Sequence, residues 1–172
     1  MPLLRVQSFA NTLDIEEDTD RLRDPAHAHA WLTSAGLIDE DAELGESDLR
    51  EARACRGALR TLLAHNASGP APTDQELAPL RDLAQRSRPS VTIGPTGTVE
   101  LSCQGDLVDG LVGLLLIVGD AQSDGTWSRL KLCANPDCGW AFYDRSRNQQ
   151  GSWCSMAVCG NRLKNRRFRA RG

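Results

Sequence analysis

The sequence predicts an α+β fold: a mainly helical N-terminal domain with one small β-hairpin, followed by a cysteine-rich C-terminal module. Three observations lead to this prediction. Apolar residues recur near every 3.6 positions in several segments before residue 125, as in amphipathic helices. Two alternating segments flank a Gly-Pro-Thr-Gly turn, as in a hairpin. Four of the six cysteines form two close pairs after residue 130. We therefore expect domains at residues 1–125 and 126–172.

The composition is typical of a soluble globular protein, with 40% hydrophobic and 25% charged residues. No apolar stretch approaches the roughly 18 residues of a membrane-crossing helix, so we expect no membrane partner. The first 18 residues lack a basic stretch ahead of a long apolar run, which argues against a signal peptide. We expect a cytoplasmic protein, whose cysteines are reduced or bound to metal rather than paired as disulfides.

The net charge of −3 hides an asymmetry along the chain. Residues 1–144 hold all 23 acidic residues and 12 basic ones, a net charge of −11. Residues 145–172 hold eight basic residues and no acid. An acidic body repels a polyanion, whereas a basic terminal segment attracts one.

The first predicted helix covers residues 24–35. Asp24 is placed to cap it, Pro25 suits its first turn, and a glycine follows its end. Trp31 and Leu32 are expected to face the core.

The second predicted helix covers residues 47–66, with Ser47 as its cap and leucines along one face. Its four arginines, at positions 50, 53, 56 and 60, occupy much of the remaining surface. Such a row can bind anions, but it is more often a solvent-exposed face, and we expect the latter. Cys55 of this helix is expected to be a small buried apolar residue.

Three further elements complete the N-terminal domain. Thr73 and Glu76 form a capping box that opens a helix, in which Pro79 predicts a kink or a delayed start. Residues 90–93 and 98–103 are expected to pair as a hairpin. The most apolar helix is expected over residues 106–122, where glycines would let neighbouring elements approach closely.

The cysteine pairs predict a metal site. Cys133 and Cys138 enclose four residues, Cys154 and Cys159 enclose four more, and 15 residues separate the pairs. One tetrahedral ion needs four ligands, and four thiolates leave no position open for water or substrate. The spacing favours one structural zinc ion. An iron–sulfur cluster can use the same ligands, whereas a redox pair favours two intervening residues rather than four.

Residues around the cysteines are expected to complete a small module. Trp140 and Phe142, on a strand or tight hairpin, are placed to cover the metal. Asp144 is expected to form an ion pair with Arg145 or to lie in a turn. From Cys154 the sequence suits a helix whose basic residues form two stripes. Such a helix is either solvated or meets an anion, and the basic residues of this segment are Arg145, Arg147, Arg162, Lys164, Arg166, Arg167, Arg169 and Arg171.

These motifs resemble a known family. The segment from residue 133 to 171, and especially WCSMAVCGNR, resembles the CGNR zinc finger, named for residues that stand here as Cys159, Gly160, Asn161 and Arg162. VQSFANTLD, residues 6–14, and the later W-L-x-x-x-G-L segment resemble the opening of the ABATE domain that usually precedes this finger. Family members are described as stress-induced transcription regulators. The resemblance implies that the cysteines bind zinc and that the finger binds DNA, for which the eight basic residues named above are the expected nucleic-acid contacts.

We therefore expect a transcription regulator that binds double-stranded DNA through a zinc finger and a C-terminal basic helix. Its N-terminal domain is expected to sense a small-molecule ligand or to mediate assembly, including homo-oligomers. The alternative is a zinc-stabilised interaction module whose basic helix docks on an acidic partner without specific DNA binding. No catalytic triad order, phosphate loop or open metal site is visible, so we do not expect an enzyme.

Overall fold

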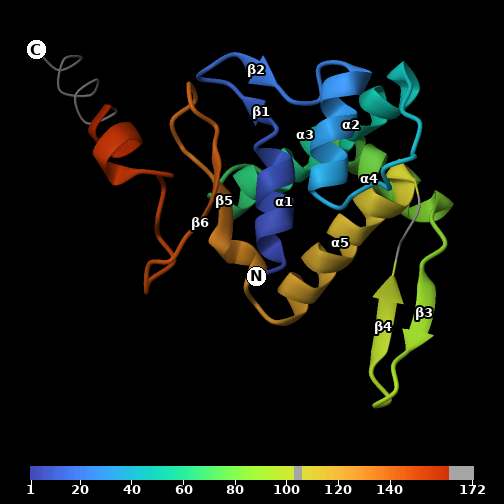
Figure 1. Cartoon of the computed structure of the whole chain (residues 1–172). Coiled ribbons are helices and arrows are strands. Elements are labelled where there is room, and N and C mark those ends of the chain that lie inside the picture. Colours follow the sequence, from blue (N-terminus) through green and yellow to red (C-terminus); the bar gives the residue numbers. More distant parts are fainter. Residues whose placement is uncertain (103–105, 163–172) are drawn as a thin grey trace, which may run out of the picture.

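The computed structural model describes residues 1–102 and 106–162 (Figure 1). The fold is α+β as predicted, because packed helices are combined with two-stranded antiparallel hairpins. The elements in chain order are α1 (Leu3–Ala10), β1 (Leu13–Asp14), β2 (Thr19–Asp20), α2 (Pro25–Ser34), α3 (Glu46–Asn66), α4 (Asp74–Arg86), β3 (Ser90–Ile93), β4 (Val99–Ser102), α5 (Leu107–Ser123), η1 (Trp127–Arg129), β5 (Leu130–Leu132), β6 (Ala141–Tyr143) and η2 (Met156–Gly160).

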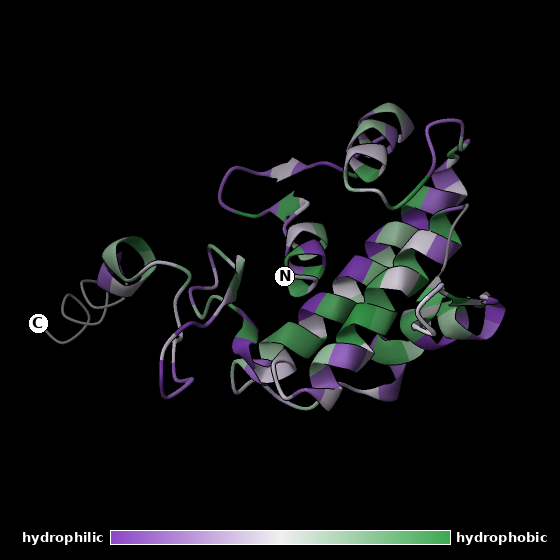
Figure 2. Cartoon of the chain, turned by 60° about the horizontal axis from the view of Figure 1, so that its bottom comes forward, coloured by the Kyte–Doolittle hydropathy of each residue, from purple (hydrophilic) through white to green (hydrophobic). Residues whose placement is uncertain are grey.

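The main core lies among α1, α2, α3, α4 and α5, and Figure 2 shows hydrophobic residues along the helices of the body. Helix α1 is absent from the expected elements, although Leu3, Val6 and Phe9 recur with helical spacing and are buried. Residues Trp31 and Leu32 of α2 face the core as predicted, and the Trp31 ring lies 6.2 Å from that of Phe9 between centroids. In the described part of the chain, no helix is long and apolar enough to cross a bilayer.

Helix α3 begins earlier than expected. The residue at its N-cap is Gly45 rather than Ser47. The side chain of Asp48 accepts a hydrogen bond of 2.8 Å from the Gly45 N–H. This bond satisfies the backbone at the start of the helix without a capping side chain at Gly45. Cys55 is buried as predicted, and desolvation raises its pKa to about 11.

The expected solvent-exposed arginine face of α3 is confirmed only for Arg50 and is wrong for the other three, because the side chains of Arg53, Arg56 and Arg60 bond within the protein. Arg56 is only 5% exposed and donates from its two Nη atoms to the carboxylate of Asp20, at 2.6 and 2.7 Å. Burial alone would raise the pKa of Asp20, but its bonds with Arg56 and with the Leu22 N–H lower it. These arginines therefore tie α3 to the chain that precedes it.

Helix α4 begins at the predicted capping box, and α5 begins at Leu107, within one residue of its predicted start. The Thr73 hydroxyl accepts from the Glu76 N–H, and the Glu76 carboxylate accepts from the Thr73 N–H at 2.8 Å. Pro79 lies inside α4 and does not delay its start. In α5, a Cβ added to Gly110 would lie 1.8 Å from the carbonyl oxygen of Leu37. The glycine therefore permits the close approach that the sequence predicts.

The β3–β4 hairpin is paired as predicted and extends from the helical body at the end of the molecule opposite the cysteines (Figure 1). Its register places Val91 opposite Leu101 and Ile93 opposite Val99. Cys103, which was expected at the end of its second strand, lies outside the described residues.

The β5–β6 hairpin separates two cores. Its cross-strand pairs are Leu130 with Tyr143 and Leu132 with Ala141 on one face, and Lys131 with Phe142 on the other. The first face packs into the main core, where the side chains at 130 and 141 are fully buried. On the other face, the ring at 142 packs in a separate cluster with the cysteines. The hairpin therefore links the helical body to the cysteine module.

Candidate metal centre

The structure brings the four predicted cysteines, Cys133, Cys138, Cys154 and Cys159, to one point. Their Sγ atoms all lie within 4.8 Å of one another, with 3.6 Å between residues 138 and 154 and 3.7 Å between 154 and 159. Four sulfurs at about 2.3 Å from a tetrahedral zinc ion are separated by about 3.8 Å. The donor set and the spacing therefore fit one Zn²⁺.

The first cysteine pair lies on the turn between β5 and β6. The N–H of Cys133 donates to the carbonyl oxygen of Trp140 at 2.8 Å. The N–H groups of Cys138 and Gly139 both donate to the carbonyl oxygen of Asn135 at 3.0 Å. Gly139 has a φ of +55°, which other residues rarely adopt. The turn thus fixes two sulfurs on one side of the metal position.

The second pair brackets the start of a helical turn. The hydroxyl of Ser155 accepts from the Val158 N–H, and the carbonyl of the same serine accepts from the Cys159 N–H at 2.9 Å. The prediction of a helix that begins at Cys154 is wrong. The helical turn η2 begins at Met156, so the first cysteine of the pair precedes it. Only Cys159 is therefore carried by the helical turn itself.

The thiols lie in a partly desolvated cluster. Cys133, Cys138 and Cys159 are buried, and Cys154 is half-buried. Burial raises the pKa of Cys138 to about 11 and also raises that of Cys154. Burial opposes ionisation of Cys159 too, but a bond from the buried amide of Asn135 and contacts with the other thiols lower its pKa. Metal binding must displace protons here, so affinity for the metal falls as the pH falls.

Aromatic side chains cover the site as predicted. Phe142 is buried against the cysteines, and Trp140 and Trp153 pack on the same cluster. The signature glycine, Gly160, has a packing role: an added Cβ would lie 2.5 Å from Met156 Sδ and 3.2 Å from Trp153 Cδ1. Four sulfurs close the coordination sphere, so this site stabilises the fold and leaves no position for metal-bound water.

A buried ion pair braces the loop between the cysteine pairs. Asp144 does not pair with Arg145. It accepts instead from Lys131 Nζ at 3.0 Å, with side chains 3% and 7% exposed. It also accepts from the N–H groups of Ser146 and Gly151 at 2.9 and 2.7 Å, which confirms the expected turn. Burial alone would raise the pKa of Asp144, but these bonds bring it well below the usual range.

Two polar residues of the body hold the cysteine module through hydrogen bonds to its backbone. The amide of Asn11 donates to the carbonyl of Ala141 at 2.9 Å and accepts from its N–H at 2.7 Å. Arg60 donates to the carbonyl oxygens of Ala10 and Gly139, both at 2.9 Å. Neither contact was expected. The one available signal was that Asn11 belongs to the VQSFANTLD segment.

The predicted nucleic-acid contacts are only partly described. Arg145 and Arg147 lie on the braced loop with exposed side chains and no bonded partner in the described residues. Arg162, at the end of the last helical turn, donates to Glu16 with 2.5 Å between Nη1 and Oε1. The other expected residues, Lys164, Arg166, Arg167, Arg169 and Arg171, lie outside the described residues.

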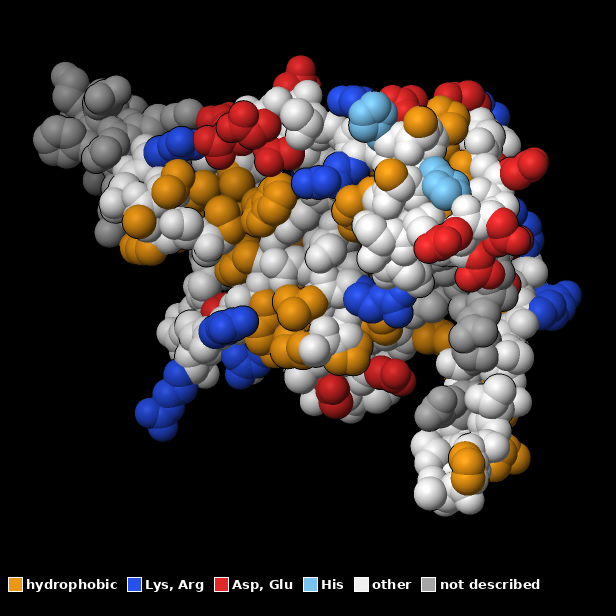
Figure 3. Space-filling view, viewed as in Figure 1, with side chains coloured by type: hydrophobic (Ala, Val, Ile, Leu, Met, Phe, Trp, Pro, Cys, Tyr) orange, Lys and Arg blue, Asp and Glu red, His pale blue; other side chains and the backbone are white. Residues whose placement is uncertain are grey.

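An acidic loop, residues 14–18, lies beside the metal site. Asp14 accepts from the N–H groups of Glu16 and Glu17, which holds the turn between β1 and β2. A hollow of about 250 Å³ separates this acidic loop from Trp140, Val158 and three of the cysteines. Figure 3 shows acidic side chains, a basic side chain and hydrophobic side chains meeting there. This surface therefore combines an apolar floor with an acidic rim.

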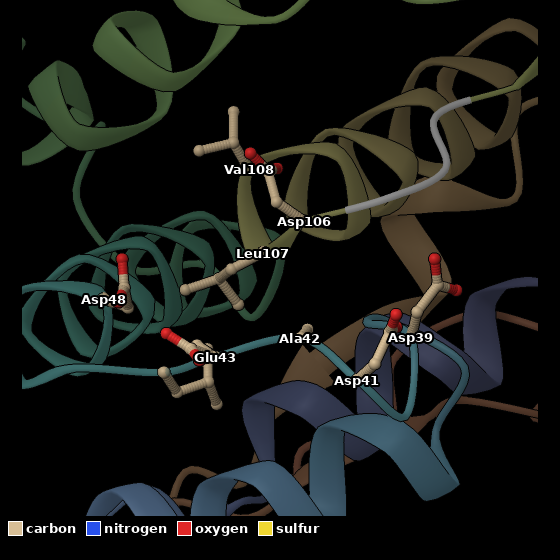
Figure 4. Close-up of a pocket in the computed structure, with 9 residues that line it drawn as sticks. Asp39, Asp41, Ala42, Glu43, Asp48, Asp106, Leu107 and Val108 are labelled. Carbon is tan, nitrogen blue, oxygen red and sulfur yellow. The ribbon is translucent and has the colours of Figure 1, made fainter.

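A second hollow, of about 350 Å³, lies at the other end of the helical body (Figure 4). Its apolar part includes Leu107 and Val108 at the start of α5. Carboxylates from three segments surround it, namely Asp39, Asp41, Glu43, Asp48 and Asp106.

The fold and the four-sulfur site define a zinc-finger protein with a helical N-terminal domain. A family model for the CGNR zinc finger matches residues 129–172. The ABATE model, described as "Putative stress-induced transcription regulator", matches residues 5–121, and the chain belongs to this family. Both assignments agree with the architecture that the sequence predicts. No curated protein shows a significant sequence match.

Proposed function

We propose that the protein is a transcription regulator that binds double-stranded DNA through its finger. The observation that carries the proposal is the loop between the cysteine pairs, where Arg145 and Arg147 are exposed on a backbone braced by Asp144. Residues 145–172 contain eight basic residues and no acid, as expected of a segment that meets a polyanion.

The chemistry of the finger suits such contact. Guanidinium groups donate bidentate hydrogen bonds to phosphate or to guanine. Zinc, when bound, supplies folding stability through four thiolates. The chain's own residues set the position of the finger. Asp144 fixes the loop that carries Arg145 and Arg147, and Asn11 and Arg60 fix the finger on the body. We assign no catalytic step to this closed site.

A salt titration of the full-length protein with duplex DNA tests the proposal. If about four phosphates are neutralised, log affinity falls against log salt concentration with a slope of about −3.6. Replacing Arg145 and Arg147 with alanine should reduce the slope by about 1.8. The matched control is Arg50→Ala, an exposed arginine on the body. Absence of binding at low ionic strength would contradict the proposal.

One observation favours a second function, docking on an acidic protein. Arg162, the signature arginine, bonds to the acidic loop of this same chain rather than remaining free. The finger can therefore accept a carboxylate partner. To distinguish the two functions, binding of a labelled oligoglutamate peptide and of duplex DNA is compared at one ionic strength. Tighter binding of the peptide favours docking, and tighter binding of DNA favours the regulator.

Ligand sensing by the N-terminal domain belongs to the same proposal. The 350 Å³ hollow has room for a small molecule, and its five carboxylates would select a cationic one. A rise in melting temperature with an organic diamine, lost in Asp106→Asn, would support this role. Equal responses of the wild type and the variant would contradict it.

A further inference from the structure

The β3–β4 hairpin presents one continuous apolar face. Residues opposite one another in an antiparallel pair, and residues two apart on a strand, point to the same side. The register therefore places Val91, Ile93, Val99 and Leu101 on one face. Their exposed fractions are 62%, 74%, 66% and 56%, respectively. We call these four side chains the hairpin face.

The hairpin extends away from the body, opposite the finger (Figures 1 and 3). The sheet has two strands, and among the described residues no third strand pairs with either edge. A two-stranded hairpin is marginally stable in water by itself. An apolar hairpin with open edges is also a template for strand pairing with another chain. A covering partner would therefore stabilise this element.

Charge restricts the kind of partner. The hairpin, residues 90–102, contains one charged residue, Glu100, although residues 1–144 together carry a net charge of −11. The four side chains of the hairpin face are uncharged, so a strongly basic or acidic partner would find no complementary charge on that face. Two copies of the acidic body repel each other, but a contact at the projecting hairpins keeps the bodies apart. The neutral apolar surface that fits the hairpin face is the same face of a second copy.

The available area agrees with a reversible dimer. Each of the four side chains offers roughly 100 Å² of apolar surface, so the hairpin face offers about 400 Å² per copy. A standard stable interface buries about 800 Å² per partner. The hairpin face supplies about half of this area, and pairing along open strand edges would add to it. A contact of this size is expected to be weak and reversible.

We propose that the hairpin face joins two copies of the chain about a twofold axis. An isologous contact uses the same patch on both copies, and the hairpin face provides such a self-complementary patch. The fingers then lie at the two distant ends of the dimer. If the proposed DNA binding also holds, such a dimer can present two fingers to two half-sites. The dimer itself does not depend on DNA binding.

Sedimentation of the full-length protein between about 1 and 200 μM, without DNA, tests the proposal. We expect the mass to rise with concentration from 18.8 kDa towards twice that value. Ile93→Asp and Val99→Asp each place a carboxylate in the contact and should weaken the dimer by at least about tenfold. The matched control is Leu4→Asp, at an exposed apolar side chain of α1, and it should sediment as the wild type does.

The replaced hairpin side chains are exposed, so the variants should keep the wild-type circular dichroism spectrum. A wild-type protein that stays monomeric throughout the range would overturn the proposal. Dimers of unchanged strength in both hairpin variants would overturn it as well. Variants that lose binding to lipid vesicles while the wild type sediments as a monomer would assign the face to a membrane instead. DNA is absent from every arm, so failure here leaves the proposed function unaffected.

Discussion

The two cores of this protein are built differently. The main core buries apolar side chains from α1, α2, α3, α4 and α5, among them Phe9, Leu59 and Leu63. The second core consists of four cysteines with Trp140, Trp153 and one further aromatic ring. Burial of one aromatic side chain contributes only a few kcal/mol. The body is therefore stabilised by apolar burial, whereas the finger depends on the metal that its sulfurs bind.

The two cores are not fully separate, because the β5–β6 hairpin belongs to both of them. Its residues Leu130 and Ala141 are fully buried in the body, and Phe142 lies with the cysteines. Loss of the metal should therefore disturb the edge of the body as well. Substitutions in each core, and then in the contacts between them, test whether apolar burial stabilises the body and the metal stabilises the finger.

The largest effect is expected from Cys159→Ser. Zinc contributes roughly 10–16 kcal/mol to the folding of small metal-dependent modules. We expect bound zinc to fall from one equivalent to near zero, measured by elemental analysis, with loss of near-ultraviolet dichroism from the finger tryptophans. Cys55→Ala, at a buried cysteine of α3, should retain one equivalent. Equal zinc in both variants would contradict the site assignment.

The next largest effect is expected from Asp144→Asn. This change leaves Lys131 as an unpaired buried charge, at a cost of about 3 to 5 kcal/mol in the free energy of unfolding. Denaturant titration at pH 7 measures this cost.

The pH dependence of the same variant gives a second readout. Because the folded-state pKa of Asp144 is lowered, its stabilisation is complete above the unfolded pKa of about 3.9. It is lost as the pH falls from there through the folded pKa. The difference between the wild type and Asp144→Asn should therefore shrink on acidification below about pH 4. A pH-independent difference would contradict the role of this carboxylate, and Asp39→Asn, at an exposed carboxylate, is the control.

Leu59→Ala tests the body core without touching the finger. The side chain is 1% exposed, and removing a buried leucine costs about 2 to 5 kcal/mol. We expect lower stability in denaturant but one equivalent of bound zinc. Loss of zinc from the folded variant would show that the two cores cannot be separated as described.

A smaller effect is expected from Asn11→Ala, which removes both bonds to the backbone of Ala141. Each lost bond to a partly buried group costs about 0.5 to 1.5 kcal/mol. Hydrogen exchange at the Ala141 amide should quicken, while zinc content stays at one equivalent. Asn148→Ala, at an exposed asparagine, is the control. Unchanged exchange would show that these bonds do not hold the hairpin edge.

The smallest effect on stability is expected from Glu16→Gln. Both partners of its ion pair are exposed, at 38% for the glutamate and 53% for Arg162. Water and salt screen such pairs, so the melting temperature should not change measurably. A shift of several degrees would show that the acidic loop helps to hold the finger.

The sequence predicts the parts of the molecule that depend on local patterns. The capping box at Thr73, the alternating segments of the β3–β4 hairpin and the cysteine spacing each specify structure within a few residues. Helix α1 is short and has no side-chain cap, so its signal is weak. The partner of Arg56 lies 36 positions away, and helical periodicity cannot identify it. The contacts that place the finger on the body were missed for the same reason.

The hydrogen bonds between Asn11 and Ala141 can form only late in synthesis of the chain. The two partners are 130 positions apart in the chain. At 5 to 20 residues per second, the ribosome completes the second partner about 6 to 26 seconds after the first. During that interval the nascent helices lack their last hairpin, and Asn11 remains without its partner. Ala141 is made 130 residues after Asn11, so this edge of the body reaches its final state only after β6 has been made.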